Sequence, residues 1–252
     1  MDIKTVLITQ ARTGSKRLPN KILMKVNNTP LLKIHLDRLS KSKRVDKIIV
    51  ATTNNKEDDI IENNAKEWGY EVFRGSENDV LDRFYQAVKY FKPTWIVRVT
   101  SDCPLIDSSL VDKVIELTQI GDKDYGSNII DETFPDGQDV EVFKFSALEN
   151  AWENAIKSSD REHVTPFIRN NSFLKKGNIF SALSYRNDID YSKVRMTIDM
   201  QCDFELIRII IGVLGINKSW LEYTEYIISN KLLEINGKIN RNEGYYKSLK
   251  ND

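Results

Sequence analysis

The N-terminal half of the chain alternates short apolar runs with amphipathic segments of roughly ten residues, and this pattern constrains the fold more than any other feature. The apolar runs are short and rich in β-branched residues, so they predict strands at 5–9, 47–52, 71–73 and 95–99. The segments between and after them have helical spacing, at 30–39, 56–68, 79–90 and 109–118. Strands that alternate with helices form βαβ units and therefore a mainly parallel sheet.

The pattern changes from about residue 124 onward. The runs 139–145 and 180–185 predict antiparallel strands or a side ribbon, and 146–156 and 163–170 predict helices. The run 194–198 predicts a return to the sheet, and 203–214 begins a helical C-terminal part. With no repeat or linker in the chain, we interpret 1–252 as one α/β domain with a small inserted antiparallel lobe at about 124–190.

A cation-rich loop follows the first expected strand. The segment 10–23 reads QARTGSKRLPNKIL and contains four cations with two small residues between the first two: Arg12, Gly14, Ser15, Lys16, Arg17 and Lys21. Ligands bind beyond the carboxyl ends of parallel strands, and such a loop can surround a triphosphate there. A solvated basic loop is the competing interpretation. The loop lacks the GxxxxGK[ST] of a P-loop and the GxGxxG of a dinucleotide site, so both classes fit poorly.

Two aspartates are placed to hold a metal ion at the same edge. Asp102 directly follows the strand at 95–99, and Asp199 directly follows the run 194–198. Mg²⁺ prefers hard oxygen ligands and typically takes one or two carboxylates together with phosphates and water. The competing interpretation makes both residues turn or helix-capping groups.

Several other side chains suggest structural roles. We interpret Asp203 as a helix cap, Asp58 and Asp59 as solvated charges at a helix start, and His35 as a structural residue of an amphipathic helix. The tryptophans are interpreted as core or partly buried aromatics: Trp68, Trp95, Trp152 and Trp220.

The bulk composition excludes several protein classes. Thirty-seven basic residues balance 37 acidic ones, so the formal net charge is zero and binding to long nucleic acid is not expected. Cys103 and Cys202 are too few and too far apart for a disulfide scaffold or a zinc knuckle. No apolar stretch reaches the ~18 residues of a spanning helix, and the start MDIKTVLITQ does not resemble a signal peptide, so we expect a cytoplasmic protein.

The segment ARTGSKRLPNKIL resembles the signature loop of the bacterial cytidylyltransferases that make activated 3-deoxy-octulosonate and sialic acid, roughly ARxGSxRLPxKxL. The whole chain is still more similar to the spore-coat polysaccharide biosynthesis cytidylyltransferases, through VDKIIVATT, GSENDVLDRF, VRVTSDCPLID, FPDGQDVEVF, REHVTPFIR, TIDMQCDFEL and NEGYYKSL. This resemblance implies a Rossmann-like (GT-A-like) nucleotidyltransferase fold, CTP as donor and Mg²⁺ as cofactor. A homodimer is plausible by resemblance to the octulosonate and sialate enzymes.

The resemblance also implies metal ligands. In that family the aspartates of the segments xxDxPLI and VDTPED hold the catalytic metal, and they match Asp102 and Asp199. The second segment reads IDMQCD here, so both aspartates are kept while the Thr-Pro turn is lost, which puts the local turn geometry in doubt.

The expected nucleotide contacts come from the loop, from polar residues at strand ends and, through the resemblance, from GSENDVLDRF. Strand-end polar residues are often plain turn chemistry. The predicted nucleotide-binding residues are Ala11, Arg12, Gly14, Ser15, Lys16, Arg17, Lys21, Thr52, Thr53, Asn54, Arg74, Gly75, Asp79, Arg83, Thr100 and Ser101.

Acceptor binding is expected in the irregular second half, from PDGQDVEVF and REHVTP. The candidates are Asp136, Asp139, Glu141, Arg161, Glu162 and His163, with turn carboxylates and a surface histidine as the competing interpretation. The region 124–190 is accordingly the expected acceptor-binding or oligomerisation lobe.

We therefore predict transfer of a cytidylyl group from CTP to a small anionic acceptor with release of pyrophosphate, for surface polysaccharide biosynthesis. Arg12, Arg17, Lys21 and Asp102 are the expected catalytic residues. Ulosonic acids, phosphorylated small acids and phosphorylated polyols are open as acceptors. One alternative is a GT-A-type glycosyltransferase, although SDCP has one aspartate where such enzymes usually carry DxD. The other is an inactive nucleotide-binding scaffold, which an eroded loop or a lost metal aspartate would favour.

Overall fold

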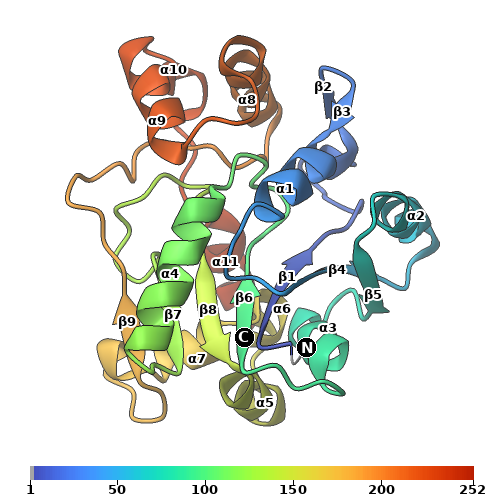
Figure 1. The fold of residues 1–252 in the computed structure, drawn as a ribbon, viewed down its shortest axis with the longest axis vertical. Helices are drawn as coiled ribbons and strands as arrows, with labels where there is room; N and C mark the ends of the chain where they lie inside the picture. The colour runs from blue at the N-terminus through green and yellow to red at the C-terminus, as the bar shows by residue number, and fades with distance from the viewer. Residues whose placement is uncertain (1–2) are drawn as a thin grey trace.

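A seven-stranded sheet forms the centre of the computed structural model, which describes residues 3–252 (Figure 1). The strand order is β5-β4-β1-β6-β8-β7-β9. The strands are β1 Thr5–Gln10, β4 Lys47–Thr53, β5 Glu71–Gly75, β6 Trp95–Arg98, β7 Tyr125–Ser127, β8 Glu141–Lys144 and β9 Ala182–Ser184. β1 pairs in parallel with β4 and β6, and β4 with β5, so these four strands end at one edge. β8 runs antiparallel between β6 and β7, which brings its first residue, Glu141, to that same edge.

Helices cover both faces of the sheet because alternate strand residues point to opposite sides. Val6 and Ile8 pack with α3 and α5, whereas Leu7 packs with α4. α8 and α9, at the top of Figure 1, share a separate apolar cluster with α1. The helices are α1 Leu31–Leu39, α2 Asp59–Glu67, α3 Val80–Val88, α4 Ser108–Ile120, α5 Phe145–Asn154, α6 Ser158–His163, α7 Pro166–Asn170, α8 Gln201–Leu214, α9 Trp220–Ser229, α10 Leu233–Asn236 and α11 Glu243–Ser248.

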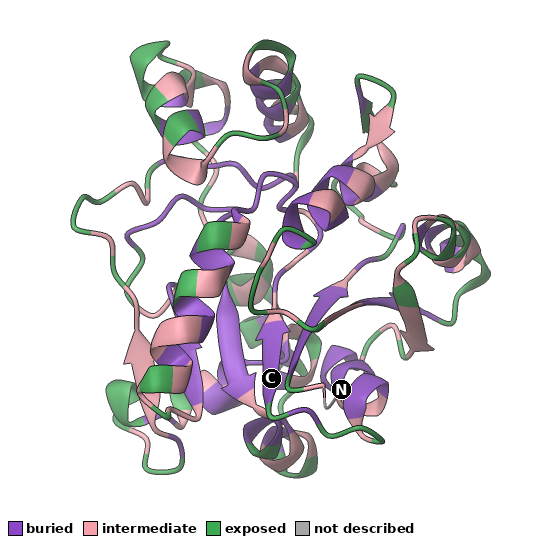
Figure 2. Ribbon diagram, in the orientation of Figure 1, coloured by how far each residue is buried: buried purple, intermediate pink, exposed green. Residues whose placement is uncertain are grey.

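Burial is concentrated in the central strands, and the outer faces of the helices are exposed (Figure 2). β2 Lys25–Val26 and β3 Thr29–Pro30 form a separate two-stranded antiparallel sheet directly after the cation-rich loop. Across residues 3–252, none of the helices combines the length and the apolar character needed to cross a bilayer.

The fold class predicted from the sequence is confirmed: the structure is mixed α/β with a mainly parallel sheet. The expected strands and helices of the N-terminal half are all present, and Gly69 follows α2 with a φ of +85°. The region 124–190 supplies β7, β8 and β9 to one side of the main sheet, together with α5, α6 and α7. Its role in acceptor binding or oligomerisation stays a prediction.

Three expectations for the second half are wrong. The run 163–170 is not one helix, because Val164 has a φ of 73° and Pro166 begins α7. β9 pairs in parallel with β7 rather than antiparallel. The run 194–198 forms no strand, since it makes one isolated bridge, Arg195 with Asp136, against a turn and not against another strand.

His35 links α1 to the sheet from a fully buried position. Its Nδ1–H donates to the carbonyl oxygen of Cys103 at 2.9 Å, so Nε2 accepts from the Thr9 hydroxyl at 3.0 Å. Burial is the main cause that lowers the pKa of His35 to about 4. The interpretation of His35 as a structural residue is confirmed.

We expect the free energy of unfolding to decrease as the pH falls from about 6.5 to about 4. In this window the unfolded chain binds a proton at His35 that the folded chain does not bind, so acid favours unfolding. A shift of roughly two pKa units corresponds to about 3 kcal/mol. Urea unfolding across this pH range measures the slope, and His35→Asn, which cannot titrate, should reduce it. An unchanged slope in His35→Asn would contradict the assignment.

We expect Gly137→Ala to lower the free energy of unfolding by about 2 kcal/mol or more, since strain and backbone overlap add. Gly137 has a φ of +103°, and a Cβ there would lie 2.7 Å from the carbonyl carbon of Met196. The matched control is Gly212→Ala in α8, where a Cβ meets nothing within 4 Å. The control should raise stability by about 0.5–1 kcal/mol through helix propensity. Urea unfolding separates the two, and effects of equal sign would refute the close approach at Gly137.

Candidate active site

The edge of the sheet where the four parallel strands end opens into a cleft of about 1380 Å³. Its walls come from the loops after β1 and β6, from the turn before β8, from α6 and α7, and from the C-terminal segment around α11. Most of the predicted site residues line it: Ala11, Arg12, Gly14, Ser15, Lys16, Arg17, Lys21, Arg83, Thr100, Ser101, Asp102, Asp136, Asp139, Glu141, Glu162, His163 and Asp199. The fold thus gathers the loop cations and both predicted metal ligands into one space.

The cation-rich loop is anchored by a buried carboxylate. Asp58 Oδ1 accepts hydrogen bonds from the Thr13 backbone N–H at 2.7 Å and from the Thr13 hydroxyl at 2.8 Å. The hydroxyl of Thr53 donates to the other Asp58 oxygen. Asp58 is only 2% exposed, so the interpretation of this residue as a solvated helix-start charge is wrong. The sequence around Asp58 does not indicate its contact with Thr13, which lies 45 residues earlier in the chain.

The loop presents its cations toward the cleft in different states of pairing. Arg12 is exposed and forms an ion pair with Glu77 at 3.2 Å. Arg17 forms one with Asp199 at 2.9 Å. Lys16 is exposed and has no ion pair with any described residue. A Cβ added at Gly14 would meet only Glu77, at 3.6 Å, so the backbone there is open to a ligand.

Asp102 and Asp199 converge as predicted, and a lysine lies between them. Lys21 Nζ donates to Asp102 Oδ2 at 2.9 Å and to Asp199 Oδ1 at 2.7 Å. Burial opposes ionisation of Asp102, but the Lys21 ammonium and a hydrogen bond from Thr100 outweigh it and lower the Asp102 pKa well below its usual value. Asp102 is therefore an anion at neutral pH.

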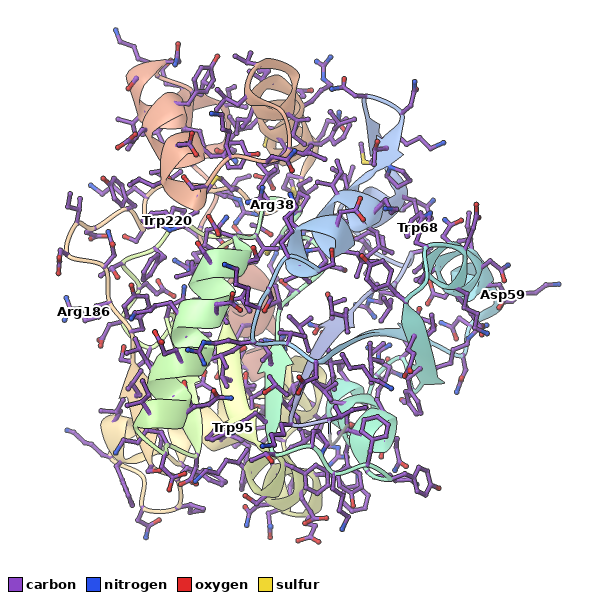
Figure 3. The ribbon with its side chains drawn as sticks, in the orientation of Figure 1. Arg38, Asp59, Trp68, Trp95, Arg186 and Trp220 are labelled. Atoms are coloured by element: carbon purple, nitrogen blue, oxygen red, sulfur yellow. The ribbon has the colours of Figure 1, made fainter. Side chains whose placement is uncertain are left out.

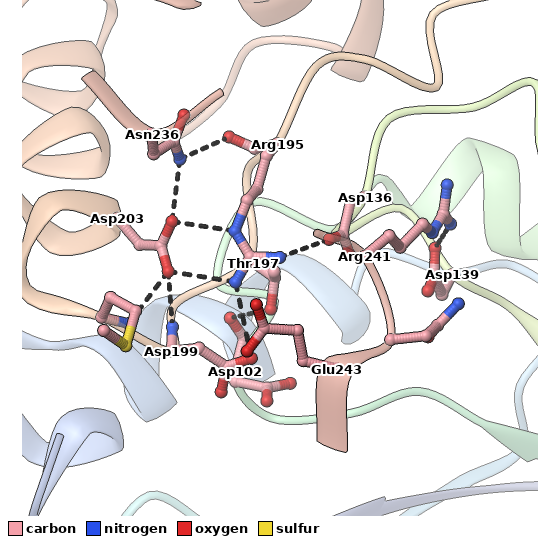
Figure 4. A network of polar contacts seen from close by, with 12 residues as sticks. Asp102, Asp136, Asp139, Arg195, Thr197, Asp199, Asp203, Asn236, Arg241 and Glu243 are labelled. Carbon is pink, nitrogen blue, oxygen red and sulfur yellow. Dashed lines mark hydrogen bonds and ion pairs between the residues drawn. The ribbon is translucent and has the colours of Figure 1, made fainter. Parts of the chain in front are cut away.

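The buried guanidinium of Arg195 contacts Asp199 and two further carboxylates (Figure 4). The Arg195 guanidinium donates to Asp203 at 2.9 and 3.1 Å, to Asp136 at 2.5 Å and to Asp199 at 3.4 Å. Asp203 Oδ2 also accepts from the backbone N–H groups of Asp199 and Met200, both at 2.9 Å. Asp203 is not the predicted N-cap of α8, which is Met200, but its carboxylate forms a capping box from the third helical position and fixes the turn that the missing Thr-Pro left in doubt.

The pair of carboxylates fits a Mg²⁺ site that substrate completes. Among the described residues no group of three or more acidic, histidine or cysteine side chains could hold a metal alone. Mg²⁺ typically uses one or two carboxylates plus substrate phosphates and water, so Asp102 and Asp199 match that ligand count. The convergence of both on one cation, the Lys21 ammonium, shows that they can share one.

Arg83 on α3 lines the cleft near the loop and is 2% exposed. Within the part of the chain that the structure describes, its Nε and Nη1 have no hydrogen-bond partner. Burial is the main cause that lowers the pKa of Arg83 to about 10, so the group is still a cation at neutral pH. A buried cation that lines a cleft and forms no ion pair with a described carboxylate is suited to an anionic ligand.

The structure does not bring seven of the predicted residues to the cleft. Asp79 caps α3 and forms an ion pair with Arg161 at 2.7 Å, and Arg74 is held by Asp59 and Glu62 on α2. The residues outside the cleft lining are Thr52, Thr53, Asn54, Arg74, Gly75, Asp79 and Arg161. Their binding roles stay predictions without geometric support.

Two of the acceptor candidates, Glu141 and His163, lie near Arg98 and Arg169 in the cleft. Arg98 donates to Glu141, and the Tyr125 hydroxyl donates to Glu141 at 2.6 Å. Burial opposes ionisation of Glu141, yet Arg98 and Arg169 keep its pKa below the usual value. His163 accepts from or donates to the Ser248 hydroxyl at 3.0 Å, and burial together with nearby arginines lowers its pKa to about 4.

Several cleft residues were missed by the sequence analysis: Glu77, Arg98, Arg169, Arg195, Glu243, Tyr245 and Tyr246. An arginine inside the apolar run VRMTI was a signal for Arg195, because a charge in a buried segment needs partners. Glu243 and Tyr245 belong to NEGYYKSL, where only the resemblance pointed to any role. The aromatic residues Trp68, Trp95 and Trp220 lie on separate elements and pack against the core, as predicted (Figure 3).

Comparison with known proteins shows relatives along most of the chain. The family model described as cytidylyltransferase matches residues 6–239. The chain is 47% identical over 209 residues to an uncharacterized protein of Methanocaldococcus jannaschii, covering 81% of this chain and 82% of that one. It is 34% identical over 213 residues to the spore coat polysaccharide biosynthesis protein SpsF of Bacillus subtilis, covering 81% and 84%.

Solved structures share the fold. A cytidylyltransferase from Leptospira borgpetersenii serovar Hardjo-bovis superposes with a TM-score of 0.85 at 34% identity, over 96% of this chain and 100% of that one. A CMP:2-keto-3-deoxy-manno-octonic acid synthetase complexed with CTP gives a TM-score of 0.61 at 13% identity, over 83% and 98%. Because the family model spans residues 6–239 and the relatives align along most of the chain, the protein belongs to the cytidylyltransferase family and is a nucleotidyltransferase.

Proposed function

We propose that the cleft transfers a cytidylyl group from CTP to a small anionic acceptor used for a surface polysaccharide, with release of pyrophosphate. The observation that carries this proposal is that a loop of four cations and two converging carboxylates line the same cleft. CTP is the donor that the family implies, and the similarity to SpsF supports the link to polysaccharide synthesis.

The loop cations bind the triphosphate and spread its charge. An acceptor oxygen attacks the α-phosphorus, the bond to the bridging oxygen breaks, and pyrophosphate leaves with the electron pair. Arg12, Lys16 and Arg17 are exposed and line the cleft, so Lys16 can approach phosphate oxygens, and Arg12 and Arg17 can exchange their present carboxylate partners for them. Charge-assisted contacts of this kind stabilise the leaving group in the transition state.

Asp102 and Asp199 would hold Mg²⁺, which when bound neutralises phosphate charge and polarises the reacting phosphoryl group. Arg195 orients Asp199 through a bond of 3.4 Å and is itself fixed by Asp203. An acceptor that attacks through a phosphate oxygen needs no base. With a pKa near 4, His163 is a weak base at neutral pH. A hydroxyl acceptor would therefore need one of the acceptor-candidate carboxylates to remove its proton.

The direct test is pyrophosphate release with CTP, ATP, GTP or UTP, in the presence of Mg²⁺, against ulosonic acids and small phosphorylated acids and polyols. We expect release with CTP and one class of acceptor. Binding of CTP by calorimetry without release would restrict the acceptor to compounds outside the panel. No binding of CTP, or release that is independent of the base, would overturn the proposal.

Asp102→Asn should lower kcat/KM by at least about 100-fold, because an amide neither neutralises nor binds the metal as a carboxylate does. The matched control is Asp188→Asn, an exposed aspartate outside the cleft lining, which should keep normal turnover. Steady-state kinetics with increasing Mg²⁺ measures both variants. Near-normal turnover of Asp102→Asn would sink the site assignment.

A further inference from the structure

The cation that Asp102 and Asp199 share in this structure belongs to the chain itself. The ammonium of Lys21 lies 2.9 Å from Asp102 and 2.7 Å from Asp199, and the Lys21 side chain is only 12% exposed. Arg17 at 2.9 Å and Arg195 at 3.4 Å also contact Asp199. The two carboxylates therefore already have cationic partners before any ligand arrives.

A divalent ion cannot join this arrangement without displacing Lys21. The ammonium donates to one oxygen of each carboxylate, so an ion that both carboxylates bind at this point competes with Lys21 for the same position. An ion bound beside the retained ammonium and the Arg17 guanidinium would meet like charges in a partly buried site, where screening is weak.

A triphosphate removes that obstacle. It brings several negative charges to the cleft that Lys21 and Arg17 both line, so the two cations can move from the carboxylates to phosphate oxygens. At Lys21 the side chain has to move, but the backbone does not. Its backbone is held in the short helix Lys21–Leu23, with the Met24 N–H donating to the Lys21 carbonyl at 3.2 Å, and a lysine stem has four rotatable bonds.

We propose that Lys21 closes the metal site of the nucleotide-free protein and opens it when the triphosphate binds, so that metal and nucleotide bind with strong positive coupling. The part of this inference that concerns the nucleotide rests on the proposed function. The effect of Lys21 on metal binding does not. Coupling is reciprocal, so CTP tightens metal binding by the same factor by which the metal tightens CTP binding.

The test measures Mn²⁺ binding by electron paramagnetic resonance, with Mn²⁺ as a visible substitute for Mg²⁺, in the presence and absence of CTP. For the unaltered protein we expect weak binding alone and an increase in affinity of at least about 30-fold with CTP, a coupling within the usual range of about 5–150-fold. Lys21→Met should bind Mn²⁺ alone at least about tenfold more tightly than the unaltered protein, and the effect of CTP should shrink.

Lys16→Met is the matched control, because it removes one positive charge from the same loop but no ion pair with a described residue. It should keep the weak metal binding of the nucleotide-free protein. Adding Asp102→Asn to Lys21→Met should abolish the gain, which assigns the bound ion to this site. If Lys21→Met does not fold, as judged by circular dichroism, Lys21→Gln provides the same comparison.

Equal Mn²⁺ affinity of the unaltered protein and Lys21→Met without nucleotide would overturn the inference. An equal gain in Lys16→Met would also overturn it, since the effect would then be one of overall charge. Failure of CTP to bind the unaltered protein by calorimetry would instead refute the proposed function, while the comparison without nucleotide would still decide the role of Lys21.

Discussion

The buried guanidinium of Arg195 is the interaction on which the site depends. Its side chain is 6% exposed and contacts three carboxylates, of which Asp203 is fully buried and belongs to α8, Asp136 precedes β8, and Asp199 faces the cleft. Burying one charge without partners would be strongly unfavourable, so these groups stabilise the fold only together. Because the segment 194–198 has no strand ladder, this network and three backbone bonds hold it against the sheet: Asp136 N–H to Val194 O, Met196 N–H to Asp136 O and Ile198 N–H to Asp102 O.

The net charge of the chain is zero, but within the site the positive and negative side chains are grouped on different segments. Cations gather on the loop after β1, whereas carboxylates gather at the ends of β6 and of the segment 194–198. A triphosphate with its metal ion presents the opposite arrangement, with anionic oxygens toward the loop and a cation toward the carboxylates. This complementarity distinguishes a small nucleotide from long nucleic acid, which would need a basic surface beyond the cleft.

The parts of the structure that follow from local pattern could be predicted from the sequence. The strands and helices up to α4 follow from hydrophobic periodicity, and the approach of Asp102 to the loop follows because β1 and β6 end at the same edge. The parts that depend on distant partners could not. Nothing in the sequence near Asp58 shows that it anchors Thr13. The alternation in VRMTI favours a strand, whereas in the structure Arg195 contacts three carboxylates and the segment forms no strand. Arg74 lies near the end of β5 and Asp79 follows that strand, yet each is paired with a nearby charge and neither lines the cleft.

The long path between Asp102 and Asp199 also determines when the site can form during synthesis. The loop after β1 is anchored by Asp58, so this anchor can form once β1, β4 and the residues just before α2 have left the ribosome. The second carboxylate is positioned by Arg195, by Asp203 on α8, and by Asn236, which donates to Asp203 at 2.8 Å. Contacts between residues so far apart form late, because the intervening chain must fold first. A growing chain therefore anchors its cation-rich loop well before Asp102 and Asp199 can converge, because the position of Asp199 depends on partners in the C-terminal helices.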